Sequence, residues 1–191
     1  MTTSNYLTLS RILIIPIFGL FLYMPQNWTY VVSAALFSIA SITDFFDGYL
    51  ARKRGEETKF GAFLDPVADK LLVVVALVLI VDKYSSLWIT LASLAIISRE
   101  LIITALREWM AECGKRNVVA VSNLGKWKTT AQITAIIMLC LFKPTFEYAG
   151  IPYGAWGFTV AQMFLYVAAG ITLWSMIVYL KRAFKEMDIL N

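Results

Sequence analysis

Six long apolar stretches constrain this chain more than any other feature of its sequence. A helix needs about 20 residues to cross the hydrocarbon core of a bilayer, and stretches of nearly that length recur along the whole chain. Some are shorter because charged residues enter at one end. The pattern predicts an all-α, polytopic membrane protein, built as a bundle of six transmembrane helices. The predicted spans cover approximately residues 6–24, 29–50, 62–81, 86–106, 127–143 and 156–180.

The composition agrees with a membrane class. Soluble domains carry about 25% charged residues, whereas this chain carries 16% and is 59% hydrophobic. Its mean hydropathy is +0.69. A length of 191 residues permits one bundle, so residues 1–191 are predicted to form a single membrane domain. The N-terminus lacks a basic region followed by a small-residue cleavage site, so we expect no cleaved signal peptide.

The lysines and arginines predict the orientation. Thirteen of the 17 lie at one set of span ends, and only Lys83 and Lys143 lie at the other, while Lys70 and Arg99 fall within spans. The basic side is expected to be cytoplasmic, and both termini belong to it. The net charge of +4 comes from these clusters, which suit anionic lipid headgroups, so no nucleic acid partner is expected.

Four aspartates stand at a fixed spacing where the second span ends and the third begins. Asp44 and Asp47 are three residues apart, and Asp65 and Asp69 are four apart. On helices, each pair would lie on one face. Carboxylates beside apolar runs are costly and usually mark a functional site. Four of them need cations, and ligands that are all oxygen suit two Mg²⁺ or Mn²⁺ ions.

The aspartates also permit other interpretations. Carboxylates near span ends are often only solvated interfacial residues. They also line ion paths, although all four lie at one face and no charge lies in the middle of the first, fifth or sixth span. A non-catalytic scaffold gives no reason for converging acids. The chain has no histidine, which excludes a phosphohistidine, a histidine base and a histidine metal ligand, and Cys113 and Cys140 are not expected to form a disulfide.

The aspartate spacing, D-x2-D-G-x2-A-R-x8-G-x3-D-x3-D, resembles the signature of the CDP-alcohol phosphatidyltransferase family, with all eight signature residues present. The likeness extends over nearly the whole chain. Four further segments resemble bacterial members that use glycerol 3-phosphate: residues 5–11, 98–100, 105–110 and 125–132.

The resemblance implies a six-helix enzyme of the bacterial cell membrane, usually a homodimer, with a cytoplasmic active site. It would join CDP-diacylglycerol to sn-glycerol 3-phosphate, giving phosphatidylglycerophosphate and CMP. By this analogy Asp44, Asp47 and Asp65 hold metal ions, while Asp69 holds the second metal and takes the proton of the acceptor hydroxyl. Asp69 lies one turn deeper than Asp65, where partial desolvation favours proton uptake. The alternative for Asp69 is a role as a metal ligand alone.

The resemblance also implies contacts to CDP-diacylglycerol. Two of these residues have alternative roles: Thr8 as a helix N-cap, and Arg52 as a topology residue. An arginine at position 52 would suit the pyrophosphate, because its planar fork binds such oxygens in pairs. The contacts carried over are Thr8, Asp47, Gly48, Arg52, Thr58 and Gly61.

The acceptor carries a phosphate, so a second basic pocket is expected. Arg99 is the leading candidate, because it lies within an apolar span about 12 Å from Arg107 along a helix, at the depth of the aspartates. Arg107, Lys126 and Lys128 would complete the pocket, although each alone is more often a topology residue. The alternative for Arg99 is an ion pair with Glu100 or an aspartate. Family members that use inositol, serine or choline would share the aspartates but need a different pocket.

Overall fold

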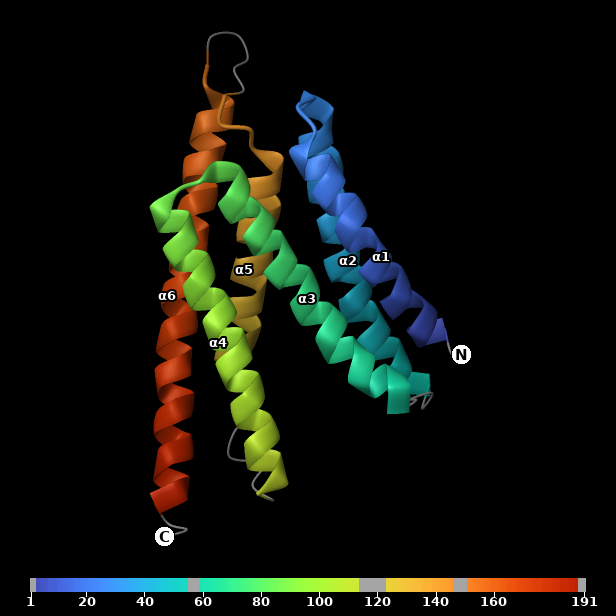
Figure 1. Cartoon of the computed structure of the whole chain (residues 1–191), viewed down its shortest axis with the longest axis vertical. Coiled ribbons are helices and arrows are strands. Elements are labelled where there is room, and N and C mark those ends of the chain that lie inside the picture. The colour runs from blue at the N-terminus through green and yellow to red at the C-terminus, as the bar shows by residue number, and fades with distance from the viewer. Residues whose placement is uncertain (1–2, 55–58, 114–122, 146–150, 189–191) are drawn as a thin grey trace. The chain divides into compact units, whose positions relative to one another are not determined.

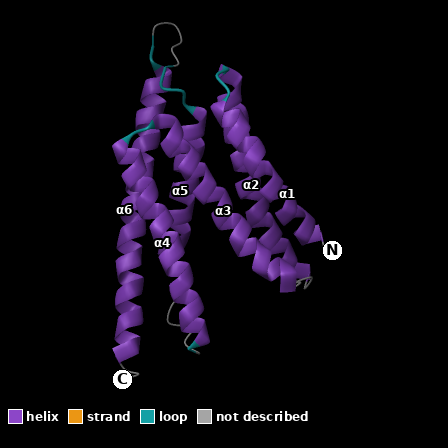
Figure 2. Cartoon of the chain, viewed as in Figure 1, coloured by secondary structure: helices purple, strands orange, loops and turns teal. Residues whose placement is uncertain are grey.

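Six α-helices form the regular framework of the part of the chain that the structure, a computed structural model, describes (Figures 1 and 2). The described residues are 3–54, 59–113, 123–145 and 151–188. Within them, the side chains of residues 3–9, 44–54, 59–66, 69, 123–128, 182 and 185–188 are not described. The helices are α1 Thr3–Tyr23, α2 Asn27–Arg54, α3 Lys59–Tyr84, α4 Leu87–Glu112, α5 Asn123–Leu141 and α6 Tyr153–Asp188.

Each predicted apolar span overlaps one of these helices, so the all-helical fold is confirmed. Within the described residues, α4 and the Tyr153–Lys181 part of α6 are long and apolar enough to cross a membrane, judged by length and composition. These two helices also expose large apolar side chains, among them Trp88 and Trp174. Such exposure is unusual in water and typical of a surface that another apolar phase covers. That all six helices cross the membrane stays a prediction.

The chain divides into two compact units. The first comprises Met1–Tyr84 and Ile136–Ala161, and the second comprises Ser85–Ala135 and Gln162–Asn191. The single membrane domain predicted from the sequence stays a prediction.

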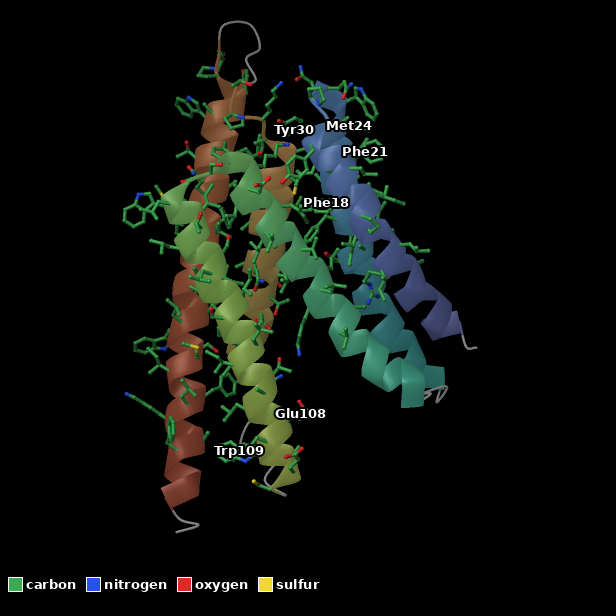
Figure 3. All side chains as sticks on the ribbon, viewed as in Figure 1. Phe18, Phe21, Met24, Tyr30, Glu108 and Trp109 are labelled. Atoms are coloured by element: carbon green, nitrogen blue, oxygen red, sulfur yellow. The ribbon has the colours of Figure 1, made fainter. Side chains whose placement is uncertain are left out.

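In the first unit, α1 packs against both α2 and α3. Phe18 lies on α1 (Figure 3). Its ring is 5.8 Å from that of Phe37 on α2, and both side chains are fully buried. A Cβ added at Gly19 would lie 3.2 Å from Leu79 Cδ1 on α3. Glycine therefore permits the close approach of α1 and α3 at this point.

The ends of these helices are joined by polar contacts. Tyr23 at the end of α1 donates a hydrogen bond to Asp82 on α3, and Lys83 donates to the backbone carbonyl of Leu22. The last carbonyls of a helix have no partner within the helix, so Lys83 satisfies one of them. Tyr84 then donates to the carbonyl of Leu139 at 2.9 Å, which joins the end of α3 to α5.

In the second unit, α4 and α6 share a small buried core. Ile103 and Met110 on α4 pack with Tyr179 on α6, and each of the three is at most 3% exposed. Leu106 and Met176 pack against this group and are partly buried. The core lies beside the arginines for which the sequence predicts phosphate binding.

Candidate active site

The four aspartates lie on two consecutive helices of the first unit. Asp44 and Asp47 belong to α2, and Asp65 and Asp69 belong to α3. The helical part of the prediction is therefore confirmed, and helix geometry places each pair along one face of its own helix. The side chains themselves are outside the described part of the structure, so their convergence stays a prediction.

The short connection between α2 and α3 sets the aspartates at matched levels. Only four residues separate Arg54 from Lys59, and both helices extend away from this connection (Figure 1). Asp47 lies seven residues before Arg54, and Asp65 lies six residues after Lys59. At 1.5 Å per residue, both are about 10 Å from the connection.

The second aspartate of each helix lies one step further along. Asp44 and Asp69 are each ten residues from the connected ends of their helices, which is about 15 Å. Two levels result, with one aspartate from each helix on each level. Carboxylate oxygens are the ligands that Mg²⁺ and Mn²⁺ prefer, and the binding of two cations by these aspartates stays a prediction.

The residues predicted to contact the nucleotide are spread over three helices of the same unit. Gly48 and Arg52 lie in α2 beyond Asp47, Gly61 lies near the start of α3, and Thr58 falls outside the described residues. Thr8 lies in α1, five residues after the first residue of that helix. A role for Thr8 as the N-cap is therefore wrong, because an N-cap flanks the first turn of a helix.

Arg11 is buried, which its sequence position did not predict. It is one of the thirteen basic residues that the sequence assigns to the cytoplasmic side, and its side chain is only 1% exposed on α1. A buried guanidinium is costly unless it is paired, so it marks a structural or functional site. The sequence contains one signal for this. Arg11 belongs to the segment at residues 5–11 and lies three residues after Thr8, which places both residues on the same helix face.

Arg99 lies in the second unit and is 6% exposed. Its Nη1 lies 3.1 Å from Glu100 Oε1, and its Nη2 donates to Ser175 Oγ at 3.2 Å. The pairing of Arg99 with Glu100, an alternative left open by the sequence, is therefore present. Arg99 Nε is buried without a hydrogen-bond partner within the described structure, so the guanidinium retains donor capacity for a further anion.

Tyr179 brings Arg99 and Arg107 together, which the sequence did not indicate. The guanidinium carbons of Arg99 and Arg107 lie 5.8 Å and 5.9 Å from the centre of the Tyr179 ring. Both distances are within the range of a cation–π contact. Lys126 and Lys128 lie in the first turns of α5, and their side chains are not described. Phosphate binding by these four residues stays a prediction.

An all-helical chain with paired acids on adjoining helices, long apolar helices and a buried arginine that shares a tyrosine ring with a second arginine has the parts that a lipid phosphoryl transferase needs. A profile of the CDP-alcohol phosphatidyltransferase family matches residues 1–178. The chain belongs to this family, and the resemblance found in its sequence is confirmed.

Curated relatives match over nearly the whole chain. A protein of Salmonella paratyphi A is 52% identical over 179 residues, covering 93% of this chain and 92% of its own length, and one of Salmonella typhimurium matches equally. A protein of Escherichia coli K12 is 51% identical over 187 residues, covering 97% of this chain and 95% of its own. All three are named CDP-diacylglycerol–glycerol-3-phosphate 3-phosphatidyltransferase.

Proposed function

We propose that this chain transfers the phosphatidyl group of CDP-diacylglycerol to sn-glycerol 3-phosphate, giving phosphatidylglycerophosphate and CMP. The observation that carries the proposal is the identity of 51% to relatives named for this reaction, over 97% of the chain. The eight residues of the aspartate signature are all retained. The reaction supplies a precursor of phosphatidylglycerol and cardiolipin.

The chemistry is a displacement at the phosphorus of the phosphatidyl group. A hydroxyl oxygen of glycerol 3-phosphate forms a new bond to this phosphorus, the bond to the bridging oxygen of the pyrophosphate breaks, and CMP leaves with that oxygen. Asp69 accepts the hydroxyl proton, since no histidine is present to do so. Phosphoryl transfer of this kind depends mainly on positioning and electrostatics.

Asp44, Asp47, Asp65 and Asp69 would hold two divalent cations, Mg²⁺ or Mn²⁺, which neutralise the pyrophosphate and the leaving CMP. The two levels of aspartates on α2 and α3 support this assignment. Thr8, Gly48, Arg52, Thr58 and Gly61 would position the cytidine nucleotide around them. Gly48 directly follows a metal-ligand candidate, where the absence of a side chain allows close approach of the substrate.

Arg99 and Arg107 would bind the phosphate of the acceptor, with Lys126 and Lys128. Their shared contact with Tyr179 supports the proposal, because it holds two guanidinium groups in one place. The buried Nε of Arg99 has no hydrogen-bond partner among the described residues. A phosphate oxygen would supply the missing acceptor, and a planar guanidinium suits two oxygens at once.

The protein is proposed to be a multi-pass protein of the bacterial cell membrane with six spans, acting as a homodimer. Both termini and the aspartates would face the cytoplasm, where glycerol 3-phosphate and CMP are soluble. The basic asymmetry of the sequence and the exposed apolar side chains of α4 and α6 support this placement.

An acceptor panel tests the function. Purified protein with CDP-diacylglycerol and Mg²⁺ should release CMP with glycerol 3-phosphate, and labelled glycerol 3-phosphate should enter the lipid fraction. Inositol, serine and choline at the same concentration should give little release. Faster CMP release with one of these alcohols would be consistent with the family but would show that glycerol 3-phosphate is not the acceptor. No CMP release with any acceptor would overturn the transferase itself.

A further inference from the structure

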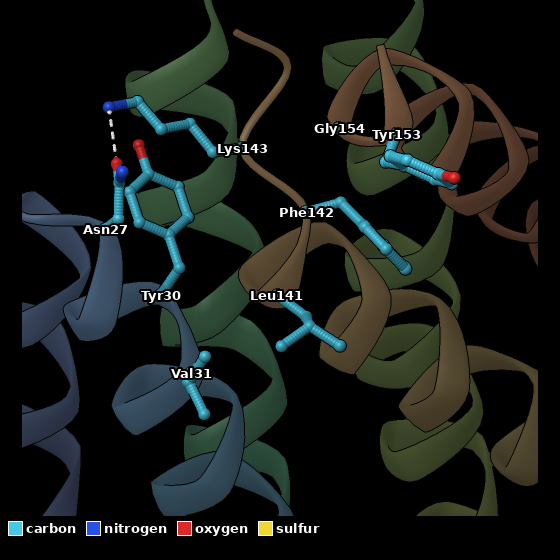
Figure 4. Close-up of a pocket in the computed structure, with 8 residues that line it drawn as sticks. All are labelled: Asn27, Tyr30, Val31, Leu141, Phe142, Lys143, Tyr153 and Gly154. Carbon is cyan, nitrogen blue, oxygen red and sulfur yellow. Dashed lines mark hydrogen bonds between the residues drawn. The ribbon is translucent and has the colours of Figure 1, made fainter. Parts of the chain in front are cut away.

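A small cavity with one lysine in its mainly apolar wall lies in the first unit, far from the aspartates along α2. It has a volume of about 260 Å³ and is lined by the first turns of α2 and α6 and by the residues that follow α5 (Figure 4). We call it the Lys143 cavity. Its wall includes Asn27, Tyr30, Val31, Phe142, Lys143 and Tyr153.

The distance along α2 between the Lys143 cavity and the aspartates matches the thickness of one bilayer core. Asn27 is the first residue of α2, and Asp47 lies 20 residues further along the same helix. This separation is about 30 Å, which is the thickness of the hydrocarbon core. If the aspartates lie at one headgroup layer, the cavity lies at the other. The proposal made below therefore rests on the membrane insertion proposed above, but it does not depend on the transferase activity.

Two lysines concentrate positive charge beside the cavity. Lys143 donates a hydrogen bond to Asn27 Oδ1 at 3.1 Å (Figure 4), and its Nζ lies 5.8 Å from the centre of the Tyr30 ring. Lys83 lies near the end of α3, and its Nζ is 3.9 Å from the centre of the same Tyr30 ring. Two ammonium groups thus share one aromatic ring. They are also the only two basic residues that the sequence assigns to this side.

Asp82, which neighbours Lys83 in the sequence, accepts a hydrogen bond from Tyr23. Burial lowers the pKa of Lys83. Like charges repel each other, so an anion bound at Lys143 would be stabilising. An ammonium group has three donors, and the Asn27 contact uses one of those of Lys143.

The remaining wall is apolar and opens outward. Val31 is 57% exposed and Leu141 is 37% exposed, next to the half-buried Phe142. A water molecule occupies about 30 Å³ in the liquid, so the cavity has room for a phosphate group and its ester linkages. A ligand with an anionic head and an apolar tail fits such a surface better than a small ion does.

We propose that the Lys143 cavity binds the phosphate of an anionic glycerophospholipid in the leaflet opposite the aspartates. Lys143 and Asn27 hold the phosphate oxygens, Lys83 adds charge through its place on the Tyr30 ring, and an acyl chain lies along Val31 and Leu141. The starts of α2 and α6 add the positive ends of two helix dipoles. The lipid would then join the start of α2 to Lys143 and to the start of α6.

Lipid binding to the purified protein in a neutral detergent tests the proposal. The probe is dioleoyl phosphatidylserine, which is neither substrate nor product of the proposed reaction, and bound lipid is counted by native mass spectrometry. We expect one tightly held phosphatidylserine and much weaker binding of phosphatidylcholine. Lys143→Gln, which keeps a hydrogen-bond donor but removes the charge, should weaken the binding about tenfold.

Matched variants separate this site from general charge attraction. Lys181→Gln removes an exposed lysine of α6 outside the cavity and should leave the binding unchanged. Val31→Trp, at an exposed position of the cavity wall, should weaken it by filling the space, and serves if Lys143→Gln does not fold. Asp47→Asn, which disables the proposed transferase, should bind phosphatidylserine normally.

Four results would overturn the proposal. The first is unchanged binding in both Lys143→Gln and Val31→Trp. The second is an equal loss in Lys181→Gln, which would indicate unspecific attraction. The third is competition by inorganic phosphate at the same concentration as the lipid, which would indicate a small-anion site. Loss of binding in Asp47→Asn alone would assign the lipid to the aspartate helices instead.

Discussion

Arg99 on α4 donates a hydrogen bond to Ser175 on α6, with 3.2 Å between Nη2 and Oγ. The two residues are 76 positions apart in the sequence. The guanidinium therefore has a structural contact besides the acceptor role proposed for it, and a useful experiment has to separate these two contributions.

Arg99→Ala should raise the apparent KM for glycerol 3-phosphate about tenfold or more, because a charge-assisted contact is lost. The KM for CDP-diacylglycerol should change much less, since the aspartates and their cations hold that substrate. Arg99→Lys should restore only part of the affinity for glycerol 3-phosphate, because the ammonium group of lysine lacks the planar fork of a guanidinium. Steady-state kinetics with each substrate varied measure these effects.

Ser175→Ala is the matched control for Arg99→Ala. It removes the hydrogen bond between α4 and α6 but leaves the guanidinium in place. It should lower the free energy of unfolding by about 1 kcal/mol with both KM values unchanged. If Arg99→Ala raises both KM values equally, Arg99 is a structural residue and the acceptor phosphate binds elsewhere.

Asp44→Asn, Asp47→Asn and Asp65→Asn should each abolish turnover while the helices remain folded, because each removes a candidate metal ligand. EDTA should abolish the activity of the unaltered protein, and added Mg²⁺ or Mn²⁺ should restore this activity. CMP release and circular dichroism measure activity and fold in parallel. Full activity in a metal-free preparation would contradict the two-cation site.

Asp69→Asn should lower kcat by at least about 100-fold, which is the usual size of a general-base contribution. CDP-diacylglycerol should still bind, since three aspartates remain to hold a cation. Equilibrium binding of the lipid nucleotide, measured beside kcat, distinguishes loss of the base from loss of the site. A variant with near-normal turnover would remove Asp69 from the proton transfer.

Gly157→Ala should destabilise the protein, whereas Gly170→Ala should not. A Cβ at position 157 would lie 2.2 Å from Phe142 Cδ1 and 2.5 Å from Phe142 Cγ, so the whole ring would have to move. A Cβ at position 170 meets nothing within 4 Å. Alanine there should be neutral or stabilise α6 by about 0.5–1 kcal/mol. Thermal unfolding in detergent compares the two, and equal stability would contradict the packing of Phe142 on α6.

Single cysteines test the orientation in a background without Cys113 and Cys140. Lys59→Cys at the start of α3 and Gln26→Cys before α2 lie near opposite ends of α2. A membrane-impermeant maleimide should label them from opposite sides, with Lys59→Cys accessible only from the cytoplasm. Labelling of both from one side would contradict the crossing of α2.

Much of the secondary structure was predictable because apolar length is a local property. Each apolar stretch became one helix, but α2 and α6 continue to Arg54 and Asp188, beyond the predicted ends at 50 and 180. Hydropathy cannot mark these ends, since a helix keeps its hydrogen bonds after its side chains become polar. The aspartate pairs were equally predictable, because helical spacing depends only on positions within one helix.

The sequence by itself determined the helices, the family and the positions of the aspartates along α2 and α3. Tertiary structure alone decided the surroundings of the basic residues. It buried Arg11, placed Arg99 and Arg107 around Tyr179, and set Lys83 and Lys143 on the Tyr30 ring. The physical reason is that such contacts join residues far apart in the chain, up to 116 positions for Asn27 and Lys143. Their partners depend on which helix faces meet in packing, and residue spacing within a helix carries no information about that.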